Sequence, residues 1–285
     1  MNVILRPGTP EDARQCGEIC YKAFRAISEQ HNFPPDFPSA EVAVALLSDL
    51  LARSDFYGVV AELDGQIVGS NFIDERSIIA GIGPITVDPA VQNRAVGRDL
   101  MQHVLARSAE RRFHGVRLVQ GAYHGRSLSL YTKLGFVARE PLTILQGKPP
   151  SVRIPGYTVR PATVGDLDAC NQVCLRVHGH DRGRELLDAI RGGIAIVIEH
   201  GVRITGYATS VAFFGHAVGE TNEELKVLIG AAPAFLGPGF LLPIRNWELF
   251  RWCLENGLRV VQPMTLMSIG LYNEPAGAFL PSILY

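Results

Sequence analysis

Two features of this sequence are suited to chemistry: a tyrosine hydroxyl and a set of backbone N–H groups at the start of a helix. The hydroxyl belongs to Tyr131, in the run SLSLYTKLGF at 127–136. The N–H groups belong to the segment QNRAVGR at 92–98, which opens a long amphipathic run. Unpaired N–H groups at a helix start, together with the helix dipole, attract an anion.

The composition of segment 92–98 favours a phosphate over an ordinary helix cap. One Ser or Asp would have capped the helix. Ala95 and Gly97 instead leave room for a phosphate to approach the backbone, and Arg94 and Arg98 can add charge-assisted contacts. The alternative is an ordinary helix entrance whose glycine only permits a turn. No Gly-Lys-Ser/Thr follows and the dinucleotide fingerprint is incomplete, so the segment matches neither a P-loop nor a dinucleotide site.

The elements that must position these groups alternate between strands and helices, which predicts a mixed α/β fold. An Asp-Gly pair at 64–65 indicates a hairpin turn, and Thr9 with Pro10 marks a helix start. The expected strands are 2–7, the two arms of a hairpin within 56–75, 78–88, 116–123 and 136–146; the expected helices are 9–24, 39–53, 94–113 and 127–135.

The chain contains an internal repeat. RPGTPEDARQCGEIC at 6–20 and RPATVGDLDACNQVC at 160–174 share six of fifteen residues without a gap. The match includes Arg6 with Arg160 and Asp12 with Asp166, and Glu62 pairs with Glu199 further on. The period is too long for a solenoid, so we predict two copies of one domain. The predicted boundaries are a first domain at 1–148, a linker rich in Pro and Gly at 149–156 and a second domain at 157–285.

The second copy is predicted to be degenerate. Matching GVRLVQ at 115–120 with GLRVVQ at 257–262 places Gly237-Pro238-Gly239 opposite residues 95–97. In this alignment residues 220–232 form an inserted helix, and the tyrosine-bearing helix has no counterpart. We expect this half to complete a substrate pocket or to pack against its partner, with retained ligand binding as the alternative.

The bulk composition excludes several classes of protein. Hydrophobic residues make up 47% of the 285 and charged residues 19%, as in a folded globular chain. A formal net charge of −1 gives no argument for a nucleic-acid or membrane partner. The N-terminus has no apolar core of a signal peptide. An odd number of cysteines then favours reduced thiols and a cytoplasmic location. Two Cys pairs lie four residues apart, at 16/20 and 170/174, and are expected to be buried helix residues, with no metal bound.

The two motifs together resemble those of the GCN5-related N-acetyltransferases. The family's first motif, Gln/Arg-x-x-Gly-x-Gly/Ala, is matched by Gln92-Asn93-Arg94-Ala95-Val96-Gly97, with Ala95 where Gly is usual. The second motif is matched by Leu130-Tyr131-Thr132-Lys133-Leu134-Gly135-Phe136. The resemblance covers residues 2–146. It implies two tandem domains, each a mostly antiparallel twisted central sheet flanked by helices.

The resemblance also implies a role for each site residue. Tyr131 would act as general acid to the thiolate of coenzyme A. The cofactor, acetyl-CoA, would lie against Ile85, Thr86, Val87, Gln92, Asn93, Arg94, Ala95, Val96, Gly97, Arg98, His124 and Ser127. In this set residues 92–98 would hold the pyrophosphate and the strand through Ile85 and Val87 the pantetheine arm. His124 stands where the motif often carries an Asn that contacts this arm.

No general base can be named from the sequence. The strand before the first motif carries no carboxylate, and Asp74, Glu75 and His31 are candidates that are more typical of solvated groups. The expected reaction is acetyl transfer to a primary amine, by default of a small molecule, with a protein N-terminus or lysine second. The alternatives are a protein that binds or senses acetyl-CoA or a metabolite without turnover, and a structural dimerisation unit; a homodimer stays open. Phe33 and Phe37, in the loop 31–39, suggest a partly apolar acceptor or anchor the loop.

Overall fold

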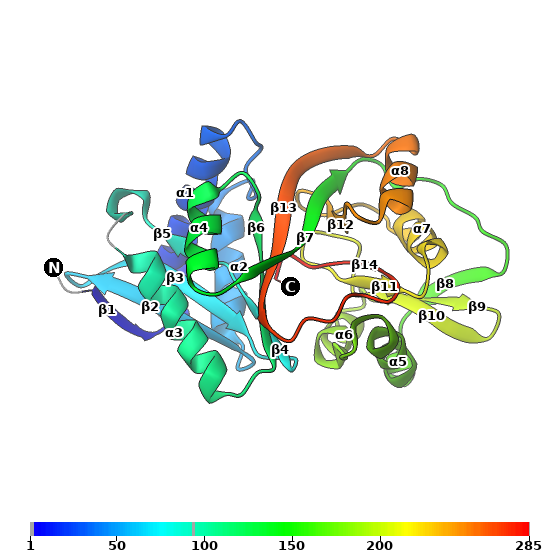
Figure 1. Ribbon diagram of the computed structural model, residues 1–285, viewed down its shortest axis with the longest axis horizontal. Helices are drawn as coiled ribbons and strands as arrows, with labels where there is room; N and C mark the ends of the chain where they lie inside the picture. Colours follow the sequence, from blue (N-terminus) through cyan, green and yellow to red (C-terminus); the bar gives the residue numbers. More distant parts are fainter. Residues whose placement is uncertain (1–2, 93–94, 285) are drawn as a thin grey trace. The chain divides into compact units, whose positions relative to one another are not determined.

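The computed structural model describes residues 3–92 and 95–284. The chain forms two compact units (Figure 1). The first contains residues 1–137, 267–271 and 284–285, and the second contains 138–266 and 272–283. The predicted boundary near 148 was placed from the sequence repeat, whereas the two units are defined by which residues pack together. By packing, most of the strand at 137–146 belongs to the second unit.

The first unit has the predicted element order. Its elements are β1 (Val3–Pro7), α1 (Ala13–Gln30), α2 (Ala40–Ala52), β2 (Phe56–Leu63), β3 (Gln66–Asp74), β4 (Ile79–Ile82), β5 (Thr86–Val87), α3 (Val96–Glu110), β6 (Gly115–Gly121), α4 (Gly125–Lys133) and the start of β7 (Val137–Gln146). Asp64 and Gly65 turn the hairpin with φ of 53° and 77°. A short 3-10 turn at Pro10–Asp12 precedes α1, which is longer at its end than predicted.

The sheet of the first unit runs in the order β1-β2-β3-β4-β6 and continues into β13 (Arg259–Gly270), whose last residues belong to this unit. All its pairs except the parallel β4–β6 pair are antiparallel where the register is defined. One buried cluster joins the sheet to α1 and α2 through residues such as Leu47 and Phe72. A second joins the opposite face to α3 and α4 through Leu100 and Tyr131 (Figure 1).

The strand predicted at 78–88 is broken into β4 and β5. Gly83 and Pro84 separate the two pieces, and Pro84 has no N–H to donate to a neighbouring strand. β4 pairs with β6 only as far as Gly81 opposite Arg117, whereas β5 pairs with β3. In the described register, β4 and β6 therefore separate beyond Gly81. The edge of β5 that faces away from β3 is not paired with the end of β6.

The second unit repeats the same order of elements. They are β8 (Tyr157–Pro161), α5 (Leu167–His178), α6 (Gly183–Arg191), β9 (Ile196–His200), β10 (Arg203–Ala208), β11 (Ala217–Gly219), α7 (Asn222–Ala231), β12 (Phe240–Pro243), α8 (Trp247–Glu255), most of β13 and β14 (Ala278–Leu280). Five strands form a sheet in the order β14-β11-β10-β9-β8, while β12 pairs with β7. Separate clusters bury α5 with α6 and α7 with α8.

The duplication is visible in a pair of identical ion triads. Arg6 donates to both oxygens of Asp12, at 2.7 and 2.8 Å, and to Glu62 at 2.8 Å. Arg160 makes the same contacts with Asp166, at 2.7 and 2.8 Å, and with Glu199 at 3.0 Å. Each aspartate also closes a capping box with the Thr three residues earlier. The repeated residues therefore make the same local structure twice.

Replacing Asp166 by Ala is expected to destabilise the second unit by about 2 kcal/mol, because a bidentate ion pair and a helix cap are lost together. Arg160 holds the pKa of Asp166 well below its usual range, so this stabilisation is present above the unfolded pKa near ~4 and disappears as the pH falls through the folded value. Calorimetric melting of the wild type and the variant should differ at neutral pH and converge in acid.

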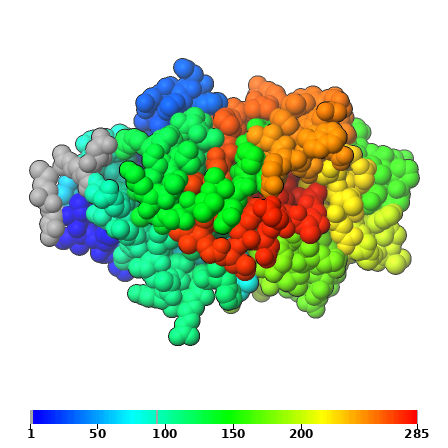
Figure 2. All heavy atoms as spheres, in the orientation of Figure 1, coloured from blue at the N-terminus to red at the C-terminus, as the bar shows by residue number. Residues whose placement is uncertain are grey.

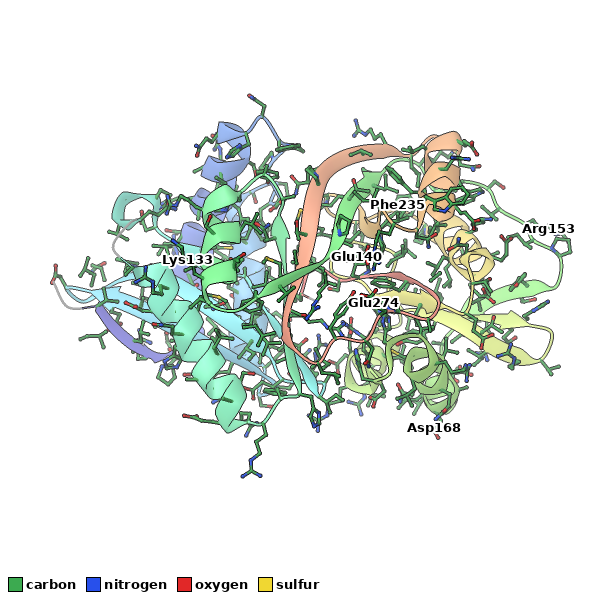
Figure 3. All side chains as sticks on the ribbon, viewed as in Figure 1. Lys133, Glu140, Arg153, Asp168, Phe235 and Glu274 are labelled. Atoms are coloured by element: carbon green, nitrogen blue, oxygen red, sulfur yellow. The ribbon has the colours of Figure 1, made fainter. Side chains whose placement is uncertain are left out.

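Asp168 provides the control for this experiment. It is exposed, two residues further along and in the first turn of α5 (Figure 3), so Asp168→Ala should change stability by no more than about 0.5 kcal/mol. Equal losses in both variants would mean that the triad contributes no more than a generic helix-start charge.

The element order corrects the predicted alignment of the second copy. α7 follows β11 as α3 follows β4 and β5, so α7 is the counterpart of α3 and not an insertion. α8 is then the counterpart of α4, which was expected to be missing. Gly237 and Gly239 do form a turn with positive φ, but it leads into β12 and not into a helix. The predicted pairing was wrong because it depended on the short match between 115–120 and 257–262, and apolar strands resemble one another in sequence.

The cysteines behave as small core residues. The five are fully buried and unpaired as disulfides, and burial raises the pKa of Cys16 to about 11. Within 3–92 and 95–284, no group of three His, Cys, Asp or Glu side chains is arranged to hold a metal ion. The described helices also include none with the length and apolar character needed to cross a membrane.

Candidate functional site

The segment predicted to bind a phosphate has an unusual helix start. Ala95, at the N-cap of α3, is in the left-handed region with φ 64° and ψ −3°. Its carbonyl accepts from the N–H groups of Arg98 and Asp99, at 2.8 and 3.0 Å. The N–H groups of Val96 and Gly97 precede the helical ladder, and no side-chain cap is found for them in the described chain. Asn93 and Arg94 lie outside the described residues.

Gly97 is not required by the protein's own packing. A Cβ at this position would meet only Val87 at 3.7 Å and Leu130 at 3.9 Å, which are ordinary van der Waals contacts. The missing side chain therefore leaves space over the bare N–H groups. Helix positions favour Ala over Gly. Among the described residues, neither packing nor a side-chain cap accounts for a glycine at this helix start.

The left-handed Ala95 is expected to carry strain that glycine would relieve. The left-handed conformation costs a residue with a side chain about 1–2 kcal/mol, while glycine adds unfolded-state entropy worth about 0.4–1 kcal/mol. Ala95→Gly should therefore melt at the same temperature as the wild type or higher. The control is Ala106→Gly on the exposed face of the same helix, which should cost about 1 kcal/mol. Equal destabilisation by both changes would show that Ala95 carries no strain.

Basic and amide side chains surround this helix start. Arg126 donates to the side-chain oxygen of Gln92 at 3.1 Å, and Gln92 in turn donates to the carbonyl of Val87 at 3.3 Å. Arg98 and Arg126 are both exposed, so their charges are available to an anion. The sequence analysis included Arg98 in the predicted phosphate site but not Arg126. Arg126 lies in the first turn of α4, the helix that carries Tyr131, and its charge there could have indicated a second anion contact.

The strand predicted to contact a cofactor arm is β5 with the residue before it. Ile85 and Val87 are half-buried and pack against the cluster that contains Tyr131. Thr86 is buried, and its hydroxyl has no hydrogen-bond partner in the described chain. Because β5 is paired with β3 alone, its other backbone edge can donate to and accept from an extended ligand.

Tyr131 lies in the same core cluster as the start of α3. It is 6% exposed, shares this cluster with Val96, and packs edge-on against Phe136 with ring centroids 6.0 Å apart. Burial raises the pKa of Tyr131 to about 12, with a smaller opposing effect from a hydrogen bond to Ser127. Ser127 Oγ also lies 2.7 Å from Nδ1 of His124. Burial lowers the pKa of His124 to about 4, so its ring is neutral at pH 7.

Three aromatic rings, those of His31, Phe33 and Tyr123, lie together just before α4, and we call them the aromatic wall. Phe33 stacks on Tyr123 with centroids 4.3 Å apart, and His31 tilts against the same ring at 5.3 Å. The loop after α1 is thereby joined to the segment before α4. Phe37 is different: it is buried and packs edge-on against Phe24, so it anchors the loop. Of the two predicted acceptor aromatics, only Phe33 is in the accessible wall.

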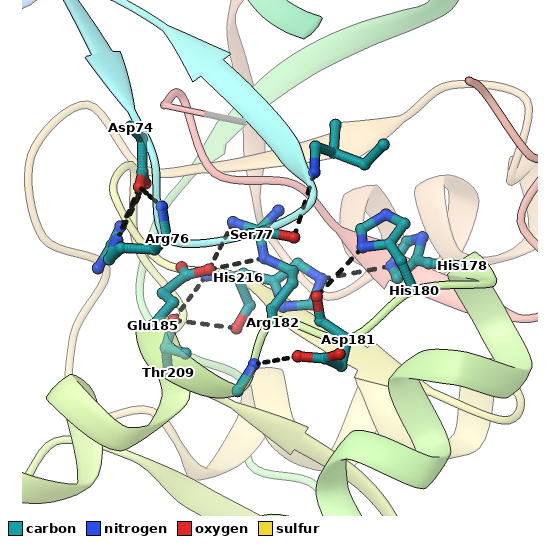
Figure 4. Close-up of polar contacts among 12 residues, drawn as sticks. Asp74, Arg76, Ser77, His178, His180, Asp181, Arg182, Glu185, Thr209 and His216 are labelled. Atoms are coloured by element: carbon teal, nitrogen blue, oxygen red, sulfur yellow. Dashed lines mark hydrogen bonds and ion pairs between the residues drawn. The ribbon is translucent and has the colours of Figure 1, made fainter. Parts of the chain in front are cut away.

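Two of the candidate bases are held in ion pairs. Asp74 accepts a bidentate pair from Arg76, with a shortest distance of 2.6 Å (Figure 4). Glu75 is paired with Arg107 at 3.0 Å and with Arg111 at 3.1 Å. These carboxylates are therefore structural partners. His31 is exposed and occupies the edge of the aromatic wall.

Gln120 is a candidate site residue that the sequence pattern did not single out. It is 6% exposed, and neither its amide nitrogen nor its amide oxygen has a hydrogen-bond partner in the part of the chain described. On β6 it lies on the same face as Val116 and Leu118, which belong to the Tyr131 cluster, beyond the point where β6 leaves β4. Burying an unpaired amide is costly. Apart from Arg117, Gln120 is the one polar side chain of this otherwise apolar strand, which was the available signal.

The second unit lacks the features of a phosphate site at the corresponding helix. Thr221 caps α7 by accepting from the N–H of Glu223 at 3.2 Å, and Glu224 closes the capping box. Glu220 and Glu223 add negative charge where a phosphate would lie, and the hydrogen bond from Arg203 lowers the pKa of Glu220, which keeps it ionised. An adjoining cavity of 570 Å³ is lined by five glutamates and one arginine; Glu140 and Glu274 (labelled in Figure 3) are two of them.

Comparison with known proteins gives one family model and several similar folds. Residues 54–138 match the model described as "Acetyltransferase (GNAT) domain". No match was found among the curated proteins.

Three solved structures resemble nearly the whole chain. An acetyltransferase, provisionally assigned, from Pyrococcus horikoshii has 20% identity and a TM-score of 0.75, over 97% of this chain and 94% of that one. A GCN5-related N-acetyltransferase from Sphaerobacter thermophilus has 16% identity and a TM-score of 0.62, over 95% and 96%. A tandem GNAT protein from the clavulanic acid biosynthesis pathway has 11% identity and a TM-score of 0.57, over 94% and 98%. At these identities the likeness concerns the fold, which is that of two tandem GNAT domains.

Proposed function

We propose that this chain is an acyltransferase of the GNAT family and that its first unit transfers the acetyl group of acetyl-CoA to a primary amine. The observation that carries the proposal is the start of α3, where the described residues supply no side-chain cap to the N–H groups of Val96 and Gly97, and where a Cβ at Gly97 would meet only Val87 and Leu130 at van der Waals distance. This anion site adjoins the helix of Tyr131, since Leu130 is within 3.9 Å of the Cβ position at Gly97. An anionic cofactor and a proton donor would thus meet in one place.

Each part of acetyl-CoA has a matching part of the protein. The pyrophosphate would take the N–H groups of residues 95–97 and the charges of Arg98 and Arg126, with Gln92 holding Arg126 in place. The pantetheine arm would pair with the open edge of β5, through Ile85, Thr86 and Val87. Its amides would also satisfy the buried side chain of Gln120.

The reaction needs a proton at sulfur and the loss of one at nitrogen. The amine attacks the thioester carbonyl, the C–S bond breaks with its electrons on sulfur, and the hydroxyl of Tyr131 protonates or hydrogen-bonds the sulfur. A buried phenol with a pKa of about 12 stays protonated at neutral pH and can donate a hydrogen bond to the thiolate as it forms. The ion-paired Asp74 and Glu75 are not used as bases. The amine arrives neutral or releases its proton through water.

The acceptor is proposed to be a small amine with an apolar part. The stacked rings of Phe33 and Tyr123 offer an apolar wall near the start of α4. A protein N-terminus or a lysine side chain is the second candidate. The proposed location is the cytoplasm, which suits five buried cysteines that form no disulfide.

Calorimetric titration with acetyl-CoA tests the cofactor assignment and counts its sites. We expect one site per chain, because the capped, acidic start of α7 disfavours a phosphate. Two sites would show that the second unit also binds the cofactor. Absence of binding would refute the acetyltransferase proposal.

Turnover separates the enzyme from a binding protein. Release of the coenzyme A thiol would be followed with spermidine, tyramine, lysine ethyl ester and a peptide with a free N-terminus. The lack of any identified base favours the alternative of a protein that binds acetyl-CoA without turnover. One-site binding with no turnover of any of these amines would support that alternative.

A further inference from the structure

Gln120 is a buried amide whose two polar atoms both lack a hydrogen-bond partner within the described chain. Its side chain is 6% exposed, and neither Nε2 nor Oε1 is bonded to another described residue. An amide that leaves water without a partner loses the hydrogen bonds it made there, which costs free energy. A ligand that offers both an acceptor and a donor would restore them. α4, in green, lies on the visible surface in Figure 2 and packs against the same cluster as β6.

The register of the sheet places Gln120 beside the split between β5 and β6. β4 and β6 run parallel, and Gly81 opposite Arg117 is the last pair in their described register. Gln120 lies three residues beyond Arg117, and the same count from Gly81 reaches Pro84. Because strands advance by a nearly constant rise per residue, Gln120 lies across the split from Pro84 and Ile85. Ile85 precedes β5, whose open edge is proposed to hold the pantetheine arm.

Gln120 and the aromatic wall lie on opposite faces of β6. Side chains alternate along a strand, so Gln120 shares a face with Leu118, which belongs to the cluster of Tyr131. Gly121 has the other face, since a Cβ there would lie 3.1 Å from Cζ of Tyr123. The aromatic wall is proposed to receive the amine. Gln120 is therefore on the face proposed for the acyl donor, on the same side of the sheet as Tyr131.

We propose that Nε2 of Gln120 donates a hydrogen bond to the thioester carbonyl oxygen, while Oε1 accepts from the nearest amide N–H of the pantetheine arm. The inference rests on the proposed acetyl transfer, and it gives Gln120 a part in the reaction itself. The carbonyl oxygen and the sulfur are bonded to the same carbon. If Tyr131 donates to the sulfur, a second donor on the same face of the sheet lies beside the oxygen.

This contact strengthens when the amine attacks. As the N–C bond forms, the π electrons of the carbonyl move onto its oxygen, which becomes negative. The carbonyl then re-forms, and the C–S bond breaks with its electrons on sulfur. An N–H group already directed at the oxygen in a buried site stabilises this transient charge without reorganisation. Gln120 keeps its own hydrogens throughout, so the proton lost by the amine and the proton gained by the thiol still balance.

Gln120→Met tests the contact because it keeps the length of the side chain and removes both hydrogen-bonding atoms. With acetyl-CoA and the best amine of the panel above, the single-turnover rate should fall about 10²-fold, as when one oxyanion donor is removed. The calorimetric Kd of acetyl-CoA should rise less than about tenfold, as for one lost neutral hydrogen bond. An unchanged rate would overturn the inference. A raised Kd alone would also overturn it, leaving Gln120 as a contact of the pantetheine arm.

Two further variants and the melting temperature exclude an indirect effect. Gln120→Met removes an unpaired buried amide, so its melting temperature should equal or exceed that of the wild type. Gln120→Glu keeps an acceptor but loses the N–H donor, and it should be at least as slow as Gln120→Met. A Gln120→Glu variant as fast as the wild type would refute donation to the carbonyl. Gln102→Met makes the same exchange at an exposed position of α3 and should change neither quantity.

Infrared difference spectra measure the contact without turnover. The carbonyl band of bound acetyl-CoA, labelled with ¹³C at the carbonyl carbon, should lie at lower frequency in the wild type than in Gln120→Met, because a hydrogen bond weakens the C=O bond. Equal frequencies with normal turnover would refute the contact and leave the proposed function standing. A lower frequency in a wild type that acetylates no amine would support the contact and refute acetyl transfer. Absence of acetyl-CoA binding would refute both.

Discussion

Tyr131→Phe is expected to lower kcat by about 10²-fold or more while leaving the affinity for acetyl-CoA unchanged. The variant removes only the hydroxyl that faces the sulfur in the proposed complex. Its ring would keep the edge-on contact with Phe136 and its place in the buried cluster beside Val96. Steady-state rates with the best amine of the panel, together with calorimetric titration of acetyl-CoA, measure the two quantities separately.

The control for this variant is its melting temperature. Loss of one hydroxyl should change the free energy of unfolding by about 1 kcal/mol, which is too little to unfold the domain. Turnover equal to that of the wild type would remove Tyr131 from the mechanism. A large fall in affinity with kcat preserved would make it a binding residue.

The pH dependence follows from the direction of two pKa shifts. The pKa of Tyr131 is raised and that of His124 is lowered, so both groups are neutral between about pH 4 and pH 12. Neither titration should therefore appear in the physiological range. A limb of the rate profile near pH 7 would instead report the amine or a base that the site does not reveal.

Much of the first unit could be predicted because local signals and the fold agree there. The hairpin at Asp64 and Gly65, the helix after Ser39 and the helix of Tyr131 follow from turn chemistry and periodicity, and the structure confirms them. The residues of the repeated Arg–Asp–Glu triads were identified as equivalent positions in the two copies, but the ion pairs among them were not predicted. Their contacts depend on strands far apart in sequence, which no local pattern contains.

The site was less predictable where its geometry depends on the backbone. Nothing in the letters showed that Ala95 adopts a left-handed conformation, or that β4 and β5 part from β6. Gln120 was missed because an amide in an apolar strand is ordinary until its lack of partners is known. The second copy was misaligned because a six-residue strand match outweighed the order of the helices, an error that the topology corrects.

Gly97→Glu should weaken acetyl-CoA binding by about 10²-fold or more, since two charge-assisted N–H contacts are lost and a like charge is added. The same change should not destabilise the fold. The Cβ has room, with Val87 at 3.7 Å and Leu130 at 3.9 Å, and a carboxylate at a helix start is favourable by about 0.5 kcal/mol. Stability and affinity are therefore expected to move in opposite directions, which is typical of a binding position and not of a packing position.

Gly97→Ala and Ala106→Glu separate the causes of that loss. Gly97→Ala adds bulk without charge and should weaken binding less, while Ala106→Glu adds the same charge at an exposed position well along the helix and should leave affinity near that of the wild type. If Gly97→Glu bound acetyl-CoA as tightly as the wild type, the pyrophosphate could not lie at residues 95–97. The bare N–H groups of α3 would then be solvated, and the cofactor would have to be sought elsewhere in the chain.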